Sequence, residues 1–548
     1  MSHTVVRGQP TAAQLYLDKI LKEILLAKGI KDNFTERDKL TIAEIIFHCL
    51  KKNPKDVCMI NGATGEKFTN EYILKRAVVL ARTMIAKGLR GKTVMLMMRN
   101  HQRTVAMYWA VIFAGVVPFM MDPNTTVYEI SSSLKLIEPH YVFCDLELHG
   151  SVTEANKLVL EVNTNVVIAD EDQYLEEFTD GFTDDYLGFQ VAESSPDGTV
   201  MLLPTSGSTG MPKAALMSNK GLVAQLVAPW SYHTRIPKPT ELAMVLTTIQ
   251  WMTFTLSAAG CAALQVPLLI SPKKSSVEHA LEMLEKYRPS WTFFGPAFGK
   301  VLIEAARPDQ LSSLRTVVLL GAPATPDVIK SFQTKLPKQA RLCDGYGTTE
   351  TQGFIAMPDR DAPVDSNGPV FNFMHYKVIN DDGVELGPGN SGEVYIKGEC
   401  VIKGYYKNDE SYKESFVDGW YKTGDWFHLD KTERLSYIER RKFSFKFMGS
   451  QVSPEEIEAV IGTVPGVQES IVCATDNGPA AVVAIDPKYT VHREHIHKAV
   501  DSTLSDHKRL RGGIAFVDAV PHTHTGKKHR GECKKLIQRL IETGECVF

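Results

Sequence analysis

The sequence predicts an α/β fold in which sheets and helices are stacked in layers. Strand-like apolar runs alternate with helical patterns, most clearly in residues 243–320, and this alternation is typical of layered α/β proteins. The chain has 548 residues, of which 44% are hydrophobic and 23% are charged, as in ordinary globular proteins. A chain of this length is expected to divide into several domains with ample core.

Two apolar segments near the start of the chain predict helices. Residues 12–28 alternate leucine and isoleucine with charged residues, which indicates an amphipathic helix packed on the domain. Residues 105–121 form the longest apolar stretch, which is shorter than the ~20 residues that span a bilayer. Because Gly115 and Pro118 interrupt it, we expect a buried helix followed by a core strand, and no transmembrane segment.

Charge and cysteine content limit the partners and the compartment. The formal net charge is −3, which argues against a nucleic-acid-binding protein, whose surface would carry a basic patch. The nine cysteines include no Cys-x-x-Cys pair, and we expect reduced thiols in an intracellular, cytoplasmic protein. No secretory signal is visible, and residues 545–548 do not form a peroxisomal address.

Three histidines, His492, His495 and His497, form a candidate metal cluster. No convincing fourth ligand accompanies them, and they lie on a charged helical stretch. A surface helix is therefore the favoured interpretation.

A glycine- and hydroxyl-rich loop between Thr205 and Lys213 predicts a phosphate site. Glycine lets the backbone approach a ligand closely, and successive amide N–H groups attract anions. The loop is not a Walker A motif, because Pro212 separates the last glycine from the lysine and an apolar run, 214–217, follows. We expect a hairpin that holds phosphates through Thr205, Ser206, Gly207, Ser208, Thr209, Gly210 and Lys213. The alternative is a mobile surface linker, but linkers seldom end in Pro-Lys between two apolar runs.

This loop resembles that of the adenylate-forming family, which includes acyl- and aryl-CoA synthetases, peptide-synthetase adenylation domains and beetle luciferases. Four further segments follow in the family's order, so the resemblance covers nearly the whole chain. It implies a large N-terminal domain, residues 1–438, that binds ATP and an acid and includes a β-rich subdomain. It also implies a hinge and a small mobile α+β domain, residues 439–548.

The second segment is Gly345 to Glu350. In the family, the equivalent tyrosine stacks on adenine, a threonine contacts the α-phosphate and the glutamate helps to hold Mg²⁺, roles that suit a flat ring, a hydroxyl and a carboxylate. The resemblance implies nucleotide binding by Gly345, Tyr346, Gly347 and Thr348, and catalytic roles for Thr349 and Glu350, with Glu350 as the metal ligand. Upstream, Gly321, Ala322 and Pro323 follow an apolar run and resemble the strand end that lines the adenine and acyl pockets.

The third segment, residues 419–425, ends in Asp425. By resemblance, Asp425 accepts hydrogen bonds from both ribose hydroxyls, which the two oxygens of a carboxylate permit. A turn aspartate is the alternative interpretation. Arg440, in the fourth segment, matches the ribose-contacting arginine of the family.

The fourth segment, residues 439–452, resembles the hinge and the start of the small domain. Lys442 matches the pivot, whereas Lys446, Gly449 and Gln451 match positions that face the site when the thioester is made, and the resemblance implies a catalytic role for Lys446. Lysines alternate with three phenylalanines here, which predicts a strand with one buried face and one polar face.

The fifth segment, residues 521–527, ends in Lys527, which matches the catalytic lysine of the family. Its ammonium would neutralise charge where the substrate carboxylate meets the α-phosphate. The neighbouring Lys528, His529 and Arg530 are expected to face solvent.

These resemblances imply an ATP-dependent acid:CoA ligase that uses ATP, Mg²⁺ and coenzyme A on a small carboxylic acid, fatty or aromatic. Two alternatives are a luciferase-like oxygenase and a binding protein without turnover; a carrier-dependent adenylation domain is a further one, but no carrier domain follows in the chain. Luminescence is disfavoured because residues 248–252 contain no histidine where many members have a His-rich segment. Trp251 of this segment forms either a pocket wall or simple core.

Overall fold

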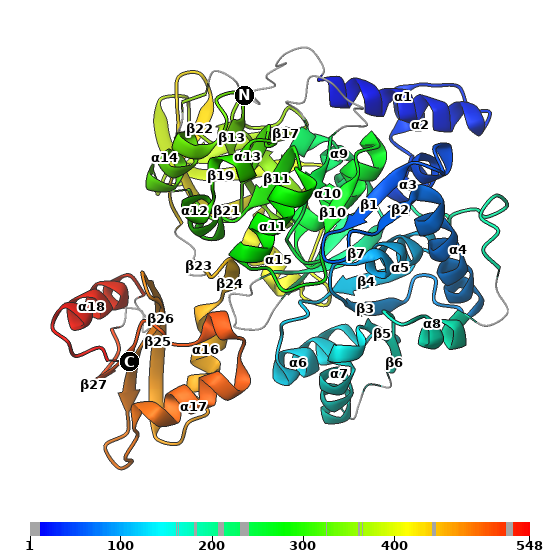
Figure 1. Ribbon diagram of the computed structural model, residues 1–548. Helices are drawn as coiled ribbons and strands as arrows, with labels where there is room; N and C mark the ends of the chain where they lie inside the picture. Colours follow the sequence, from blue (N-terminus) through cyan, green and yellow to red (C-terminus); the bar gives the residue numbers. More distant parts are fainter. Residues whose placement is uncertain are drawn as a thin grey trace.

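The computed structural model describes residues 11–159, 162, 164–179, 183–205, 213–230, 241–324, 326–359, 362–363, 365–440, 445–521 and 530–547. These residues form two helix-covered sheets, an antiparallel sheet and a smaller C-terminal lobe (Figure 1). The predicted layered α/β fold is confirmed.

The first sheet has six strands and carries the flanks of the predicted phosphate loop. Its order is β6 (Asn165–Ile168), β5 (Tyr141–Cys144), β3 (Thr93–Met97), β4 (Val117–Met120), β7 (Thr199–Thr205) and β8 (Lys213–Ser218). All neighbours are parallel except β7 and β8, which are antiparallel. The helices of this part are α4 (Asn70–Ala86), α5 (Gln102–Phe113), α6 (Val127–Ile137), α7 (Leu146–Leu158), α8 (Asp172–Thr179) and α9 (Asn219–Gln225).

The second sheet has seven strands, and its central pairs are parallel. Its order is β13 (Arg341–Asp344), β12 (Thr316–Leu319), β11 (Trp291–Phe294), β9 (Ala243–Met244), β10 (Leu268–Ile270), β1 (Val57–Asn61) and β2 (Lys67–Thr69). The helices are α10 (Met252–Leu264), α11 (Val277–Tyr287), α12 (Pro296–Ala305), α13 (Pro308–Leu311) and α14 (Pro326–Lys335). Parallel strands end at one common edge, which brings the segments after β12 and β13 together.

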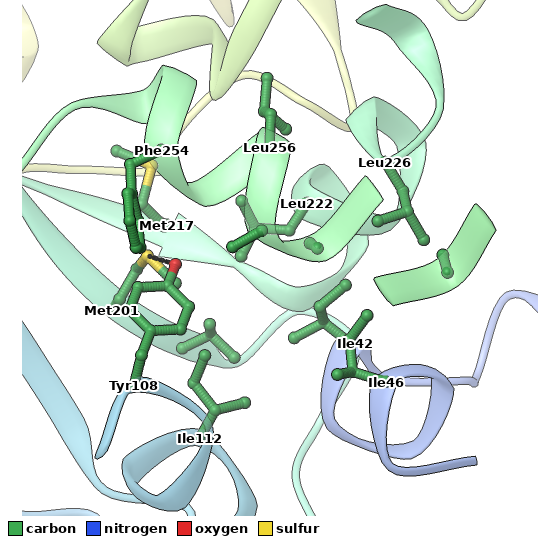
Figure 2. Packing of buried hydrophobic residues seen from close by; sticks show 14 of the residues in the cluster. Ile42, Ile46, Tyr108, Ile112, Met201, Met217, Leu222, Leu226, Phe254 and Leu256 are labelled. Atoms are coloured by element: carbon green, nitrogen blue, oxygen red, sulfur yellow. Dashed lines mark hydrogen bonds between the residues drawn. The ribbon is translucent and has the colours of Figure 1, made fainter. Parts of the chain in front are cut away.

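The main core lies where helices of both sheets meet. Figure 2 shows α5, α9, α10 and α3 (Ile42–Lys52) converging on β7 and β8. Tyr108 of α5 donates a hydrogen bond to Thr255 Oγ1 at 2.9 Å, so the buried hydroxyl has a partner. The predicted buried helix and following strand in residues 105–121 are confirmed as α5 and β4.

The predicted amphipathic helix in residues 12–28 is confirmed as α1 (Ala12–Ala27), which packs against α3. Thr11 and Gln14 cap its start reciprocally, and α2 (Phe34–Arg37) follows it. None of the described helices is both long enough and apolar enough to cross a membrane.

The third sheet is antiparallel and forms the β-rich part. Its order is β16 (Gly368–Pro369), β22 (Arg434–Arg440), β21 (Trp420–Leu429), β19 (Asn390–Gly398), β17 (Met374–Ile379) and β18 (Glu385–Leu386). The short strand β20 (Phe416–Val417) pairs with β21, and the helix α15 (Asp409–Ser415) comes directly before β20 in the chain. A separate two-stranded ribbon, β14 (Tyr346–Thr348) and β15 (Gly353–Ala356), encloses the short 3-10 helix η2 (Thr349–Thr351).

The C-terminal lobe, described over residues 445–521 and 530–547, has its own core and lies beside the larger part of the molecule (Figure 1). Its strands are β23 (Phe445–Phe447), β24 (Ser450–Val452), β25 (Val467–Thr475), β26 (Gly478–Ile485) and β27 (Ile514–Val517). Its helices are α16 (Pro454–Ile461), α17 (Arg493–Thr503), α18 (Arg530–Glu542) and the 3-10 helix η3 (Asp506–Lys508). The lobe contacts α6, where Thr126 Oγ1 donates to Thr503 O at 2.7 Å.

The three histidines of the candidate metal cluster lie at the start of α17, as the surface-helix interpretation predicts. Within the described ranges, no group of three or more histidine, cysteine, aspartate or glutamate side chains is arranged to hold a metal ion.

Candidate active site

The strands on either side of the glycine-rich loop bring Thr205 and Lys213 face to face. The two residues are register partners across β7 and β8, so the predicted hairpin strands are confirmed. Ser206, Gly207, Ser208, Thr209 and Gly210 lie outside the described residues. Thr205 Oγ1 donates a hydrogen bond to Glu350 Oε1 at 3.1 Å, which joins the end of β7 to the second predicted segment.

Tyr405 was not anticipated from the sequence, yet it links Glu350 and Lys213. Its hydroxyl donates to Glu350 Oε1 at 3.0 Å, and Lys213 Nζ lies 5.2 Å from the centre of its ring. Burial lowers the pKa of Lys213, although the carboxylates of Glu414 and Glu350 act in the opposite direction. A tyrosine in an apolar context looks like a core residue in the sequence, so no signal distinguished Tyr405.

The segment from Gly345 to Glu350 runs through the strand β14 into the 3-10 helix η2. A Cβ atom at Gly347 would lie 2.2 Å from the carbonyl oxygen of Gly353, so the close backbone approach excludes any side chain. Thr348 Oγ1 accepts from the Thr351 N–H at 3.2 Å and caps η2, which carries Thr349 and Glu350.

Asp425 is buried and lies at the centre of a polar group with Arg440 and Tyr346. It is a register partner of Arg440 across β21 and β22, and its Oδ1 lies 3.5 Å from Arg440 Nη1. The Tyr346 hydroxyl donates to its Oδ2 at 2.8 Å. Burial raises the pKa of Tyr346, and the Asp425 carboxylate raises it further, so this hydroxyl keeps its proton.

The second oxygen of Asp425 fits the predicted contact with ribose. Asp425 is 2% exposed, and its Oδ1 is buried with no hydrogen-bond partner among the described side chains and backbone groups. A buried acceptor without a donor costs free energy, and a ribose hydroxyl would supply one. Although burial alone would lower it, the Asp425 charge raises the pKa of Arg440, which stays cationic beside this carboxylate.

Lys446 reaches this site from the C-terminal lobe. Its Nζ lies 4.9 Å from the centre of the Trp251 ring and would be 2.9 Å from a Cβ added to Gly321. Gly321 follows β12 and has φ +100°, a conformation that favours glycine. The C-terminal lobe, the start of α10 and the strand end after β12 therefore meet at the Lys446 ammonium.

The position of Lys446 depends on a short hairpin. Lys446 pairs with Gln451 across β23 and β24, and the two residues between these strands, Met448 and Gly449, both have positive φ angles of 50° and 77°. Such angles match the two-residue turn that suits a twisted hairpin. Only the backbone of Gln451 is described, and Lys442 lies outside the described residues.

Charge around Lys446 is mixed. Burial lowers the pKa of Lys446 to about 8, and the Arg440 guanidinium lowers it further, whereas the Asp425 carboxylate raises it. The side chain therefore remains mainly protonated at neutral pH, close to the groups that fit a nucleotide.

Asp344 is a further residue that sequence reasoning missed. It ends β13, immediately before Gly345, and its Oδ2 accepts from Asn367 Nδ2 at 3.0 Å. Burial raises the pKa of Asp344 to about 7, although the Asn367 hydrogen bond lowers it. The one sequence feature that could have indicated Asp344 is its position directly before the segment that begins at Gly345. Ala322 and Pro323 follow β12 at the same edge of the sheet.

The site also offers a limited fit for Mg²⁺. Glu350 is the carboxylate that the described residues place beside Thr205 and Tyr405. Mg²⁺ commonly uses one or two carboxylates together with substrate phosphates, so a single glutamate at a phosphate loop suits it. Lys527, the predicted catalytic lysine, lies outside the described residues.

Comparison with known families gives two matches. Residues 46–406 match the AMP-binding enzyme family, and residues 456–527 match the AMP-binding enzyme C-terminal domain. The protein belongs to this adenylate-forming family, as its sequence resemblance predicted.

The relatives have different reactions. A 4-coumarate–CoA ligase of Vanilla planifolia is 26% identical over 540 residues, which cover 94% of this chain and 97% of that enzyme. A luciferin 4-monooxygenase of Photuris pensylvanica is also 26% identical, over 542 residues that cover 92% and 95% of the two chains.

Solved structures share the fold. The amide bond synthetase McbA from Marinactinospora thermotolerans has a TM-score of 0.79 at 21% identity, with 91% of this chain and 99% of that chain covered. An o-succinylbenzoate CoA synthetase from Bacillus subtilis has a TM-score of 0.78 at 18% identity, with 90% and 98% covered. Because ligases, an oxygenase and an amide synthetase are all similar to this chain, its reaction must be argued from its own site.

Proposed function

We propose that this protein is an acid–thiol ligase that joins a small fatty or aromatic carboxylic acid to coenzyme A through an acyl-adenylate. The observation that carries the proposal is the meeting of Lys446 with Gly321, close to Asp425 and Arg440. A lysine delivered by the C-terminal lobe to a nucleotide-type site supplies a positive charge for a second half-reaction on a bound adenylate.

In the first proposed half-reaction, a carboxylate oxygen attacks the α-phosphorus of ATP and pyrophosphate leaves. The loop from Thr205 to Lys213 holds the phosphates, Tyr346 and the strand end at Gly321, Ala322 and Pro323 border the adenine, and Asp425 and Arg440 hold the ribose. Thr349 donates to the α-phosphate, and Lys527 neutralises charge between the two anions. Mg²⁺, held by Glu350, would supply further charge neutralisation at the phosphates.

In the second proposed half-reaction, the coenzyme A sulfur attacks the carbonyl carbon, and AMP departs with the electron pair of the broken C–O bond. We propose that the lobe after residue 438 turns about Lys442, which withdraws Lys527 and brings in Lys446 with Gly449 and Gln451. A hinge is needed because one pocket must present two sets of groups in succession.

A luciferase-like oxygenase is the second candidate, since such relatives are equally similar in sequence. Residues 248–252 offer no general base, and Gln250 Nε2 is already engaged as a donor to Asp122 Oδ2 at 2.7 Å. This arrangement disfavours the oxygenase. The retained lysines and carboxylates of the site disfavour a binding protein without turnover.

The decisive experiment is ATP–pyrophosphate exchange across a panel of carboxylic acids, followed by CoA-dependent release of AMP with each acid that supports exchange. We expect exchange with at least one fatty or aromatic acid and a CoA thioester as product. Exchange without a thioester would contradict the ligase proposal and support adenylation for another acceptor. No exchange with any acid would support the non-catalytic alternative.

A further inference from the structure

Trp251 and Lys446 come from different lobes, and the Lys446 ammonium lies over the ring of Trp251. Trp251 precedes the first turn of α10, and Lys446 is the central residue of β23. The distance of 4.9 Å between the ammonium nitrogen and the ring centre lies within the range of a cation–π contact. Tryptophan has the most attractive ring face for a cation.

The backbone of Trp251 is held firmly. Its N–H donates to the carbonyl of Thr248 at 3.1 Å, and its own carbonyl accepts from Phe254 N at 2.9 Å. The preceding residue, Gln250, is tied to Asp122. The indole is therefore presented from a fixed helix start rather than from a free loop.

Lys446 is confined on its other side by the strand end after β12. A Cβ at Gly321 would lie 2.9 Å from the ammonium, so the absence of a side chain creates the space that the lysine uses. Lysine side chains are flexible and lose much rotamer freedom when they are fixed. The Trp251 ring on one side and Gly321 on the other limit the freedom of the Lys446 side chain. Neither contact is a hydrogen bond that the reaction would have to break.

Simple core packing does not account for Trp251. The side chain is half-buried, unlike the fully buried Trp109 and Trp291, and it has a cation over its face. The charged groups that shift the pKa of Lys446 are Arg440 of β22 and Asp425 of β21. Trp251 lies on neither strand, so its contact with the ammonium is separate from these two.

We propose that Trp251 is a positioning residue for thioester formation, whose indole face holds the Lys446 ammonium at the Gly321 strand end while the C-terminal lobe is docked. This inference rests on the proposed ligase function. In that step a C–S bond forms, the C–O bond to AMP breaks, and the thiol proton passes to solvent. Lys446 keeps its proton throughout and stabilises negative charge on the reacting groups.

The test compares Trp251→Leu, which removes the aromatic face, with Trp251→Phe, which keeps one. Each variant is given a preformed acyl-adenylate and coenzyme A, and single-turnover thioester formation is measured beside pyrophosphate exchange. We expect Trp251→Leu to slow thioester formation by roughly tenfold more than it slows exchange, because a cation–π contact is lost. Trp251→Phe should restore thioester formation to within about threefold of the wild-type rate.

A double-mutant cycle identifies the partner. In a Lys446→Met background, Trp251→Leu should cause little further loss of thioester formation, because the cation that it positions is absent. Full additivity of the two losses would overturn the proposal. Equal slowing of both half-reactions by Trp251→Leu, or equal defects in the leucine and phenylalanine variants, would overturn it as well.

A chemical readout separates this inference from the proposed function. Trace labelling of lysines with acetic anhydride, followed by mass spectrometry, reports the freedom of Lys446 without any turnover. We expect Lys446 to label several times faster in Trp251→Leu than in the wild type or in Trp251→Phe. Unchanged labelling would overturn the contact even in an active ligase, whereas faster labelling in a protein that makes no thioester would sustain the contact and refute the ligase.

Discussion

Lys508 of the C-terminal lobe forms a buried ion pair with Glu129 of α6. Lys508 is 8% exposed and Glu129 is 5% exposed, and Lys508 also contacts Glu456 of its own lobe at 2.8 Å. Glu129 also has a local partner, because its Oε2 accepts from the backbone N–H of Thr126 at 2.8 Å. Each charge therefore also has a partner within its own lobe. The ion pair between the lobes adds to these contacts, and it favours the docked arrangement that brings Lys446 to the site.

The first prediction concerns this contact. Lys508→Met leaves two carboxylates facing each other without a cation, and an uncompensated buried charge typically costs about 3–5 kcal/mol. We expect the lobes to separate, so that thioester formation slows at least tenfold while pyrophosphate exchange is retained. Small-angle scattering should report a more extended molecule. Lys535→Met, an exposed lysine of α18, is the matched control and should change neither measurement.

The second prediction tests the ribose site. Asp425→Asn replaces an acceptor oxygen with a donor, and hydrogen bonds to charged groups contribute about 1.5–3 kcal/mol. We expect KM for ATP to rise between tenfold and a hundredfold, and the preference for ATP over 2′-deoxy-ATP to disappear. Asp382→Asn, in an exposed turn, should behave as the wild type. A variant that still prefers ATP over the deoxynucleotide would contradict the assignment of Asp425.

The third prediction separates the two lysines. Lys527→Ala should reduce adenylation by a hundredfold or more, since loss of one well-placed charge-stabilising group costs ~3 kcal/mol, but spare thioester formation from a supplied acyl-adenylate. Lys446→Met should have the opposite effect. Stopped-flow assays of each half-reaction would measure both, with Lys528→Ala as the control. If both variants lose both half-reactions equally, the division of labour is wrong.

The fourth prediction follows from Asp344. Its pKa is about 7 in the folded protein, whereas an aspartate in an unfolded chain titrates near ~3.9. Between these values the folded state binds more protons than the unfolded state, so the free energy of unfolding falls as pH rises from about 4 to about 7. Asp344→Asn removes this decrease in the free energy of unfolding. The stability of the variant relative to the wild type should therefore rise by about 2 kcal/mol between pH 5 and pH 8. Thermal unfolding at several pH values measures the trend; a pH-independent difference would contradict it.

The fifth prediction concerns luminescence. With beetle luciferin, ATP, Mg²⁺ and oxygen, we expect little or no light, because proton abstraction beside the adenylated carbonyl needs a base within hydrogen-bond reach. Gln250 is no base at neutral pH and is bonded to Asp122. Luminometry on purified protein is sufficient, and strong sustained emission would refute the ligase proposal.

Local chemistry made much of the fold and of the candidate site predictable. The helix at 12–28, the buried helix and strand at 105–121 and the strands beside the glycine-rich loop each follow from periodicity and turn residues close in sequence. Asp425 and Arg440 were predicted separately as ribose contacts, and the antiparallel register of β21 and β22 makes them partners.

Long-range pairings were not predictable in the same way. Glu129 looks like an ordinary helix-capping glutamate in the sequence, and only the docked lobe gives it Lys508 as a partner. Tyr405 looks like a core aromatic, and Trp251 was left between a pocket wall and core packing. Their partners lie on other sheets or on the other lobe, and a single sequence carries no information on such pairs when each residue is also satisfied locally.

The hairpin that carries Lys446 has a mechanical consequence. Phe445 and Phe447 pack on the core of the C-terminal lobe, and the Phe447 ring lies so close to Gly478 that a Cβ there would be 2.7 Å away. These contacts join the strand to the core of the lobe, so a rotation of the lobe carries Lys446 with it. Timing between the half-reactions would then depend on the orientation of an entire domain, and not on the rotamer of one lysine.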